Sequence, residues 1–159
     1  MPALEVGARA PDFELKASGE QTIRLSELLK EGREVVVAFY PAAFSPVCGD
    51  ELSVFQEVLD EFERLNAQVI AISVDNIWSV GAFAKAKGIT FPLLADFHPK
   101  GAVADNYGVM NHELGLAERA LFIVDAQGVI RYSYVSPMLE NPGADRLLDA
   151  LEHMHKTRA

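Results

Sequence analysis

The chain has 159 residues, close to the roughly 150 of an average domain, and half of them are hydrophobic. A chain of this size can bury a sizeable core without disulfides or a structural metal, so one domain over residues 1–159 is expected. The formal net charge is −9 and no Lys or Arg run interrupts it, which argues against binding to nucleic acid or to an anionic membrane surface.

The N-terminal segment and the cysteine count bear on the compartment. MPALEVGARAPDFELK lacks a basic segment followed by an apolar one, and no stretch reaches the roughly 20 apolar residues of a membrane span. Cys48 is the only cysteine, which excludes an intrachain disulfide and fits a reducing compartment. The cytoplasm is the expected location.

The chain is expected to open with a small β-hairpin. Residues 13–15 and 23–25 are typical of short strands around a turn at 17–19. Ser26 is then expected to cap a short helix that ends at Lys30.

Residues 34–40, EVVVAFY, are nearly all apolar and rich in β-branched and aromatic side chains, which predicts a central strand covered on both faces. Apolar residues then recur at spacings of three and four, which predicts an amphipathic helix over 48–66. Residues 69–74 are typical of a second buried strand. A strand, a helix and a further strand form a right-handed βαβ unit with parallel strands, so the chain is expected to be an α/β protein.

A second run of elements is expected to extend this unit. Residues 77–87 are expected to form a helix that stops at Gly88, followed by a short strand over 91–95 and a helix over 101–107.

The last part of the chain predicts an antiparallel pair and a helix. Strands over 120–125 and 129–135 flank the loop 126–128, which ends in glycine. A break at 141–143 precedes a terminal helix with one apolar face. Together the pattern predicts a thioredoxin-like fold, with a central mixed sheet flanked by helices and an extra N-terminal β-hairpin.

The segment 41–48 is the first candidate for a functional site. It joins the carboxyl end of the central strand to a helix, the edge of an α/β sheet where ligands bind. Ser45 followed by Pro46 is typical of an N-cap and a proline at the first helical position, which would place Cys48 in the first turn. A thiol at the positive end of a helix is favoured as the thiolate, the nucleophilic form.

A cation is also expected near Cys48, because Asp50 and Glu51 in the same turn oppose a further negative charge. A helix end contributes about 0.3–1 kcal/mol, whereas a unit charge about 4 Å away contributes up to about 4 kcal/mol at an effective dielectric of about 20. Arg119 immediately precedes a strand expected to run antiparallel beside the central one, which brings it toward Cys48. Glu51 is expected to hold the guanidinium through a charge-assisted pair.

These residues resemble a known signature. Pro41, Ser45 and Cys48 match Pro-x-x-x-Thr/Ser-x-x-Cys of the peroxiredoxin family, and Glu51 and Phe55 fall where that family carries an acid or amide and an aromatic residue. Further matches occur at residues 10–13, 91–96, 119, 122–125 and 128. The stretch 97–110 is similar to the one-cysteine group called alkyl hydroperoxide reductase E. The resemblance covers nearly the whole chain.

The resemblance implies a thiol-dependent peroxidase. Cys48 would attack one peroxide oxygen, release water or an alcohol, and become a sulfenic acid. Ser45 and Arg119 would bind the peroxide oxygens, with Arg119 stabilising charge on the leaving oxygen. Backbone N–H groups around Val47 and Cys48 would add donors, and Pro41 would shield the thiolate from water.

The resemblance also bears on partners and cofactors. The position five residues after Cys48, a resolving cysteine in one subgroup, is Ser53, so an external thiol must complete the cycle. A low-molecular-weight thiol, a glutaredoxin-like protein and thioredoxin all fit. Phe44 and Phe97 are candidates for a substrate pocket or a contact in the homodimer that the family suggests. No cofactor or metal is expected.

Other functions remain open at this point. A thiol–disulfide oxidoreductase normally carries Cys-x-x-Cys, but Ser45 stands three residues before Cys48. A glutathione-peroxidase-like enzyme, a monothiol iron–sulfur carrier, and a thioredoxin-fold binding or chaperone module without fast turnover are the remaining alternatives. Peroxide consumption with a supplied thiol separates the peroxidase from the binding module.

Overall fold

A computed structural model describes residues 2–18 and 21–158. In these ranges the helices and strands are β1 (Glu14–Ala17), β2 (Thr22–Arg24), α1 (Leu25–Leu29), β3 (Glu34–Phe39), α2 (Cys48–Glu57), α3 (Leu59–Arg64), β4 (Ala67–Ser73), α4 (Ile77–Lys87), β5 (Leu93–Ala95), α5 (Ala102–Asn106), β6 (Met110–Asn111), β7 (Leu116–Ala117), β8 (Arg119–Val124), β9 (Ile130–Ser136) and α6 (Asp145–Arg158). The turn expected at 17–19 falls partly outside the described residues.

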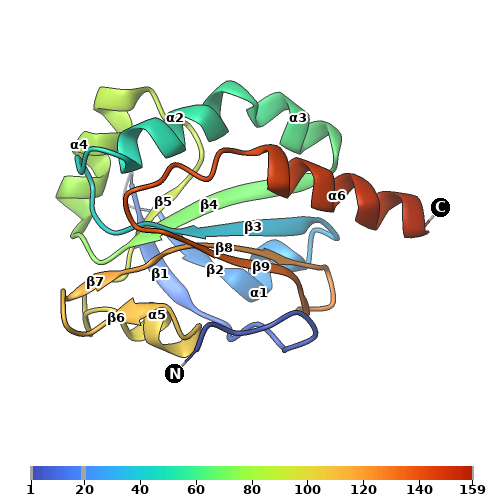
Figure 1. The fold of residues 1–159 in the computed structure, drawn as a ribbon, viewed down its shortest axis with the longest axis horizontal. Coiled ribbons are helices and arrows are strands. Elements are labelled where there is room, and N and C mark those ends of the chain that lie inside the picture. Colours follow the sequence, from blue (N-terminus) through green and yellow to red (C-terminus); the bar gives the residue numbers. More distant parts are fainter. Residues whose placement is uncertain (1, 19–20, 159) are drawn as a thin grey trace.

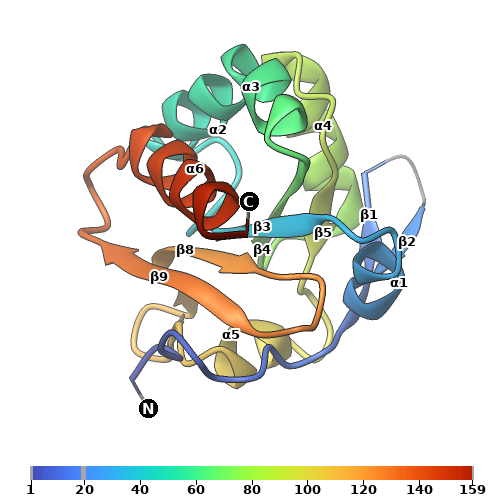
Figure 2. The ribbon, with the colours of Figure 1, turned by 90° about the vertical axis from the view of Figure 1, so that its right-hand side faces the viewer.

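The described strands form a mixed seven-stranded sheet in the order β2-β1-β5-β4-β3-β8-β9, and a separate two-stranded sheet of β6 and β7. Helices α2, α3, α4 and α6 cover one face of the large sheet, and α1 and α5 lie against the other (Figures 1 and 2). The predicted α/β class is therefore confirmed, with its flanked mixed sheet and its N-terminal hairpin of β1 and β2.

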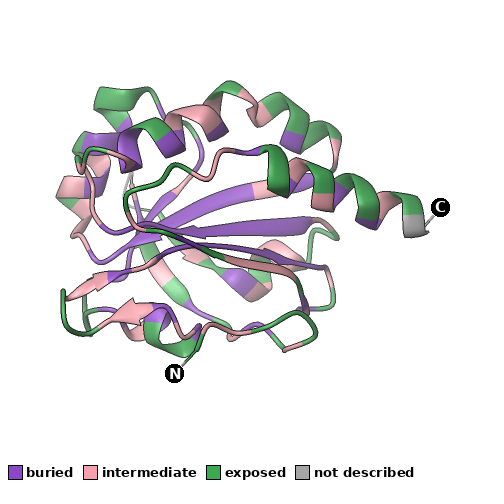
Figure 3. Cartoon of the chain, in the orientation of Figure 1, coloured by how far each residue is buried: buried purple, intermediate pink, exposed green. Residues whose placement is uncertain are grey.

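Strand β3 lies at the centre of this core. Val36 and Ala38 pack with the helices of one face, and Val35, Val37 and Phe39 pack on the other. All six residues of β3 are buried, as the purple strand in Figure 3 shows. Burying each large apolar side chain stabilises the folded state by about 1.5–3 kcal/mol, which explains why the apolar run EVVVAF forms the middle of the sheet.

The neighbours of β3 determine which loops meet at its carboxyl end. Strand β4 runs parallel to it, whereas β8 runs antiparallel, with Phe39 opposite Ala120. The start of β8 therefore lies beside the end of β3, as expected. This register brings Arg119 to the edge of the sheet from which the chain continues to Cys48.

The helix expected over 48–66 is instead two helices, α2 and α3. Val58 between them has φ −108° and ψ 19°, outside helical geometry, and its carbonyl accepts from the N–H groups of Glu61 and Phe62. Phe55 and Phe62, one from each helix, are both fully buried with their ring centroids 6.2 Å apart. The apolar spacing continues through Val58, so it does not reveal the break.

Two further expectations about local structure were wrong or incomplete. Ser26 is the second residue of α1 and does not cap the helix. Asp12, which lies outside the helix, provides an acceptor instead, and its Oδ1 accepts the backbone N–H of Ser26 at 2.9 Å. Strands β6 and β7 were not predicted, since two residues each are too short for a periodic pattern. By contrast, α4 ends as predicted, at Gly88 in the left-handed conformation (φ 66°).

Candidate active site

Cys48 is the first residue of α2 and is fully buried. It follows the loop that leaves the carboxyl end of β3, so the predicted position at the edge of the sheet and in the first helical turn is confirmed. The backbone N–H of Glu51 donates to Val47 O at 3.0 Å, which closes this first turn. The positive end of the helix dipole thus lies at the thiol.

Ser45 does not cap the helix, contrary to expectation. The N-cap residue is Val47, and no side-chain hydrogen bond caps α2, because the chain makes another turn at residues 46–47 before the helix begins. Ser45 Oγ is buried and has no hydrogen-bond partner among the described residues. A buried hydroxyl without a partner costs about 1–3 kcal/mol. The hydroxyl is thus available to a bound ligand.

Arg119 supplies the expected cation. Its Nη1 donates to Cys48 Sγ at 3.3 Å and to Glu51 Oε1 at 2.6 Å, and its side chain is only 2% exposed. Its Nε and Nη2 donate to the backbone carbonyl of Met138, at 3.0 and 2.8 Å. The structure therefore brings together the three side chains that the sequence placed here, and adds a carbonyl from a distant segment.

Glu51 is a buried acid in direct contact with this cation. Burial raises the pKa of its carboxyl from 4.5 to about 7, against the opposing hydrogen bond and charge of Arg119. Its second oxygen, Oε2, has no hydrogen-bond partner in the described chain. Burial and the contact with Arg119 thus act on this carboxyl in opposite directions, and two hydrogen bonds through Arg119 Nη1 connect the carboxyl with the thiol.

The loop that carries Cys48 is tied to the end of β4. Asp75 Oδ2 accepts from the backbone N–H of Ala43 and from Ser73 Oγ, each at 2.7 Å. Sequence reasoning missed these residues. Ser73 and Asp75 stand at the end of the second buried strand, and polar residues at that position of a parallel sheet are a signal that could have found them.

The remaining predicted residues line the same loop. Pro41 is buried at its start and Val47 is partly buried at its end. Phe44 is 58% exposed, and its ring packs on that of Phe83 with centroids 5.2 Å apart. Its backbone has φ 65°, a left-handed conformation that costs a bulky residue about 1–3 kcal/mol.

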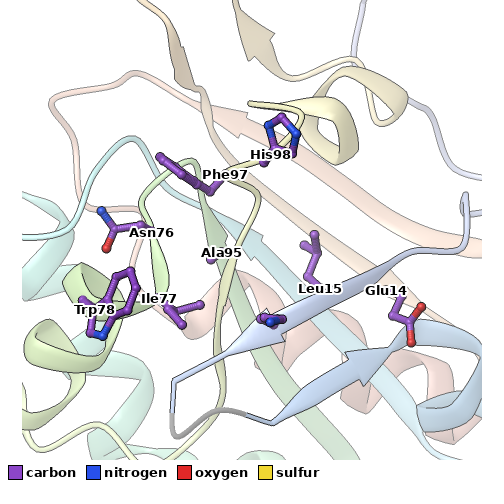
Figure 4. Close-up of a pocket in the computed structure, with 9 residues that line it drawn as sticks. Glu14, Leu15, Asn76, Ile77, Trp78, Ala95, Phe97 and His98 are labelled. Atoms are coloured by element: carbon purple, nitrogen blue, oxygen red, sulfur yellow. The ribbon is translucent and has the colours of Figure 1, made fainter.

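A separate hollow lies at the same edge of the sheet. It has a volume of about 360 Å³ and lies between β1, the end of β5 and the start of α4. Figure 4 shows Asn76 between Trp78 and Phe97, with Ile77 beside Trp78. None of the predicted catalytic residues lines it.

The described residues contain no group of three or more His, Cys, Asp or Glu that could hold a metal ion. None of their helices is long and apolar enough to cross a membrane.

The fold and site define an α/β protein whose chemistry is centred on one buried thiol beside an arginine. A sequence model of the AhpC/TSA family matches residues 6–133. Alkyl hydroperoxide reductase E of Mycobacterium tuberculosis is 41% identical over 130 residues, which cover 82% of this chain and 84% of the relative.

Solved structures agree with this assignment. Peroxidoxin BcpB of Mycobacterium tuberculosis superposes with a TM-score of 0.85 and 31% identity, over 95% of this chain and 98% of that one. AhpC of the same organism superposes with a TM-score of 0.88 and 27% identity, over 98% of this chain and 96% of that one. The chain belongs to the AhpC/TSA family, with the thioredoxin-like fold expected from its sequence. It is a peroxiredoxin, a thiol-dependent peroxidase.

Proposed function

We propose that this protein reduces hydrogen peroxide and organic hydroperoxides by a one-cysteine mechanism at Cys48. The observation that carries the proposal is the buried contact of 3.3 Å between Arg119 Nη1 and Cys48 Sγ. A guanidinium in a site screened from water stabilises both the attacking thiolate and the charge that develops on a leaving oxygen. The single cysteine of the sequence makes Cys48 the only available thiol.

In the proposed reaction the thiolate sulfur attacks one peroxide oxygen and the O–O bond breaks. The leaving oxygen takes a proton and departs as water or an alcohol, and Cys48 becomes a sulfenic acid. That proton comes from solvent in the proposal, and Glu51 holds the guanidinium of Arg119 in place through its contact of 2.6 Å with Nη1.

The remaining residues have supporting roles in the proposal. Ser45, whose hydroxyl lacks a partner, binds a peroxide oxygen together with Arg119. The N–H groups of Val47 and Cys48 at the start of α2 add donors, as helix N-termini do. Pro41, which is buried, keeps water from the thiolate. Phe44, which is exposed on the same loop, contributes to the site where the peroxide binds.

The sulfenic acid is proposed to be reduced by an external thiol. Ser53 stands where a resolving cysteine would otherwise follow Cys48 by five residues, and the sequence contains no other cysteine. A low-molecular-weight thiol, a glutaredoxin-like protein or thioredoxin can each form the mixed disulfide and then release the reduced enzyme. The cytoplasm remains the predicted location, because this cycle needs a supply of reduced thiol.

The test follows the intact mass of the reduced protein after one equivalent of hydrogen peroxide. Cys48 is expected to gain one oxygen far faster than a free thiol does, and added thiol is expected to reverse the gain. Cys48→Ser should gain nothing. If Cys48 reacts no faster than the free thiol, the protein is a binding module with a peroxiredoxin fold.

We also propose that the protein is a homodimer that associates through the sheet edge bearing the active site. Phe44, Trp78 and Phe97 follow the parallel strands β3, β4 and β5, so all three lie at this edge. They are 58%, 79% and 52% exposed, a concentration of aromatic rings that is typical of interface cores. The hollow between Trp78 and Phe97 can accept a side chain of a second copy (Figure 4).

Sedimentation of the wild type and of Trp78→Glu tests this dimer. The wild type is expected to sediment as a dimer at micromolar concentration, and Trp78→Glu as a monomer, because a carboxylate cannot be buried there without a partner. Val6→Glu, at a residue that is 60% exposed in the N-terminal segment, is the matched control and should remain dimeric. A monomeric wild type would rule the interface out.

A further inference from the structure

We infer that Ser136 is a positioning residue for Arg119, acting through the turn of residues 137–140. The inference rests on the role proposed above for Arg119 at Cys48. Ser136 is the last residue of β9 and lies opposite Arg119 in the β8–β9 ladder. It is 3% exposed, and its side chain bonds to the turn rather than to the guanidinium or the thiol.

The contacts around the guanidinium determine where Nη1 points. Nε and Nη2, which form one edge of this planar group, both donate to the single carbonyl oxygen of Met138. Nη1 then points away from that edge, toward Glu51 Oε1 and Cys48 Sγ. Because the fork of an arginine is rigid, the position of the Met138 carbonyl determines the direction in which Nη1 points.

Hydrogen bonds within the turn hold the Met138 carbonyl in place. The turn closes on itself through Glu140 N–H, which donates to Pro137 O at 3.0 Å. Ser136 Oγ lies 3.1 Å from Pro137 O and 3.3 Å from Glu140 O. Its one hydroxyl proton is therefore shared between carbonyls at the two ends of the turn, with Met138 between them.

Core packing contributes little to holding this turn. Pro137 and Glu140 are exposed, and Leu139 is 84% exposed. A turn with so little buried apolar surface depends on its hydrogen bonds for its shape. Hydrogen bonds weaken steeply with distance and angle, so a displacement of about 1 Å at Met138 is sufficient to impair the contact of Arg119 with Cys48.

The turn and the active site lie at the same edge of the sheet. Strand β9 runs parallel to β3, since each is antiparallel to β8, and both therefore end at that edge. The hydroxyl of Ser136 thus holds the turn that carries the Met138 carbonyl, and this carbonyl orients Arg119. In this inference Ser136 only positions Arg119, and its hydroxyl neither gains nor loses a proton during the reaction.

The experiment compares Ser136→Ala with Ser133→Ala in the oxidation of Cys48 by hydrogen peroxide. Ser133 lies on the same strand and its Oγ also donates to a backbone carbonyl, Leu4 O at 2.7 Å, but it is remote from Arg119 in the ladder. Ser136→Ala is expected to lower the second-order rate constant about tenfold. Ser133→Ala should match the wild-type rate constant.

Ser136→Thr and Ser136→Val form a second pair that differs only in a hydroxyl against a methyl group. Ser136→Thr is expected to keep the wild-type rate within about threefold and Ser136→Val to fall with Ser136→Ala. This pair decides the question if the alanine variant does not fold. Equal rates for Ser136→Thr and Ser136→Val would overturn the inference.

A double-mutant cycle shows whether Ser136 acts through Arg119. In an Arg119→Ala background, Ser136→Ala is expected to change the rate by less than about twofold, because no guanidinium remains to be positioned. A tenfold loss in both backgrounds would mean a general structural effect and would overturn the inference. A wild type no faster than a free thiol would instead refute the proposed function, so the two failures are distinguishable.

Discussion

Arg119→Ala is expected to slow the oxidation of Cys48 by hydrogen peroxide about 10²-fold to 10³-fold, the usual loss when one preorganised donor is removed from a buried site. The variant loses the hydrogen bond of 3.3 Å to Cys48 Sγ and the charge that favours a thiolate. It also leaves Glu51 buried without its cation. The rate constant is measured by stopped mixing and intact mass at several peroxide concentrations.

Two further variants show whether the loss comes from charge or from geometry. Arg119→Lys keeps the charge but cannot bond to Met138, Glu51 and Cys48 at once, so it should recover only part of the rate. Arg33→Ala is the matched control, because Arg33 Nη2 also donates to a backbone carbonyl, that of Ala67 at 3.0 Å, and it should leave the rate unchanged. A rate for Arg119→Ala within about threefold of the wild type would remove Arg119 from the proposed mechanism.

The second large effect is on stability. Relative to Glu51→Gln, the free energy of unfolding of the wild type is expected to fall by about 3 kcal/mol as pH rises from 4.5 to about 7. The sign follows from the direction of the pKa shift. Above pH 4.5 the unfolded carboxyl loses its proton, whereas the buried carboxyl keeps its proton up to about 7. The folded state therefore binds more protons in this window, and raising the pH disfavours it.

Urea unfolding at a series of pH values measures this difference. Glu27→Gln is the control, since Glu27 is an exposed carboxylate on α1 whose replacement should leave the pH profile parallel to that of the wild type. Parallel profiles for the wild type and Glu51→Gln would show that folding leaves the pKa of Glu51 unchanged and would contradict this prediction.

The sequence predicted most of the fold because its strands are strongly patterned. EVVVAF is apolar at every position but one, and the hairpin of β8 and β9 carries a glycine in its loop, so the sheet and its antiparallel strand could be placed. That topology alone was sufficient to bring Arg119 toward Cys48. Predicting that the two residues lie close together required only the rule that an antiparallel strand starts beside the end of its neighbour.

The parts that could not be predicted depend on backbone groups and on competing donors. Any residue can present a carbonyl, so nothing in the sequence marks Met138 as the acceptor for Arg119. Ser26 and Ser45 are both residue types that commonly cap helices. At α1, however, Asp12 Oδ1 accepts the backbone N–H of Ser26, and at α2 an additional turn separates Ser45 from the start of the helix. Capping depends on where the chain enters a helix, which is a tertiary property.

The distance along the chain between the thiol and its cation has a consequence for synthesis. Cys48 and Arg119 are 71 residues apart, and they meet only after β3 and β8 have paired. While the ribosome is still adding those residues, Cys48 has only the acidic neighbours Asp50 and Glu51 beside it. The donor that the proposed peroxide chemistry requires beside Cys48 is therefore absent from the nascent chain until these two strands have paired.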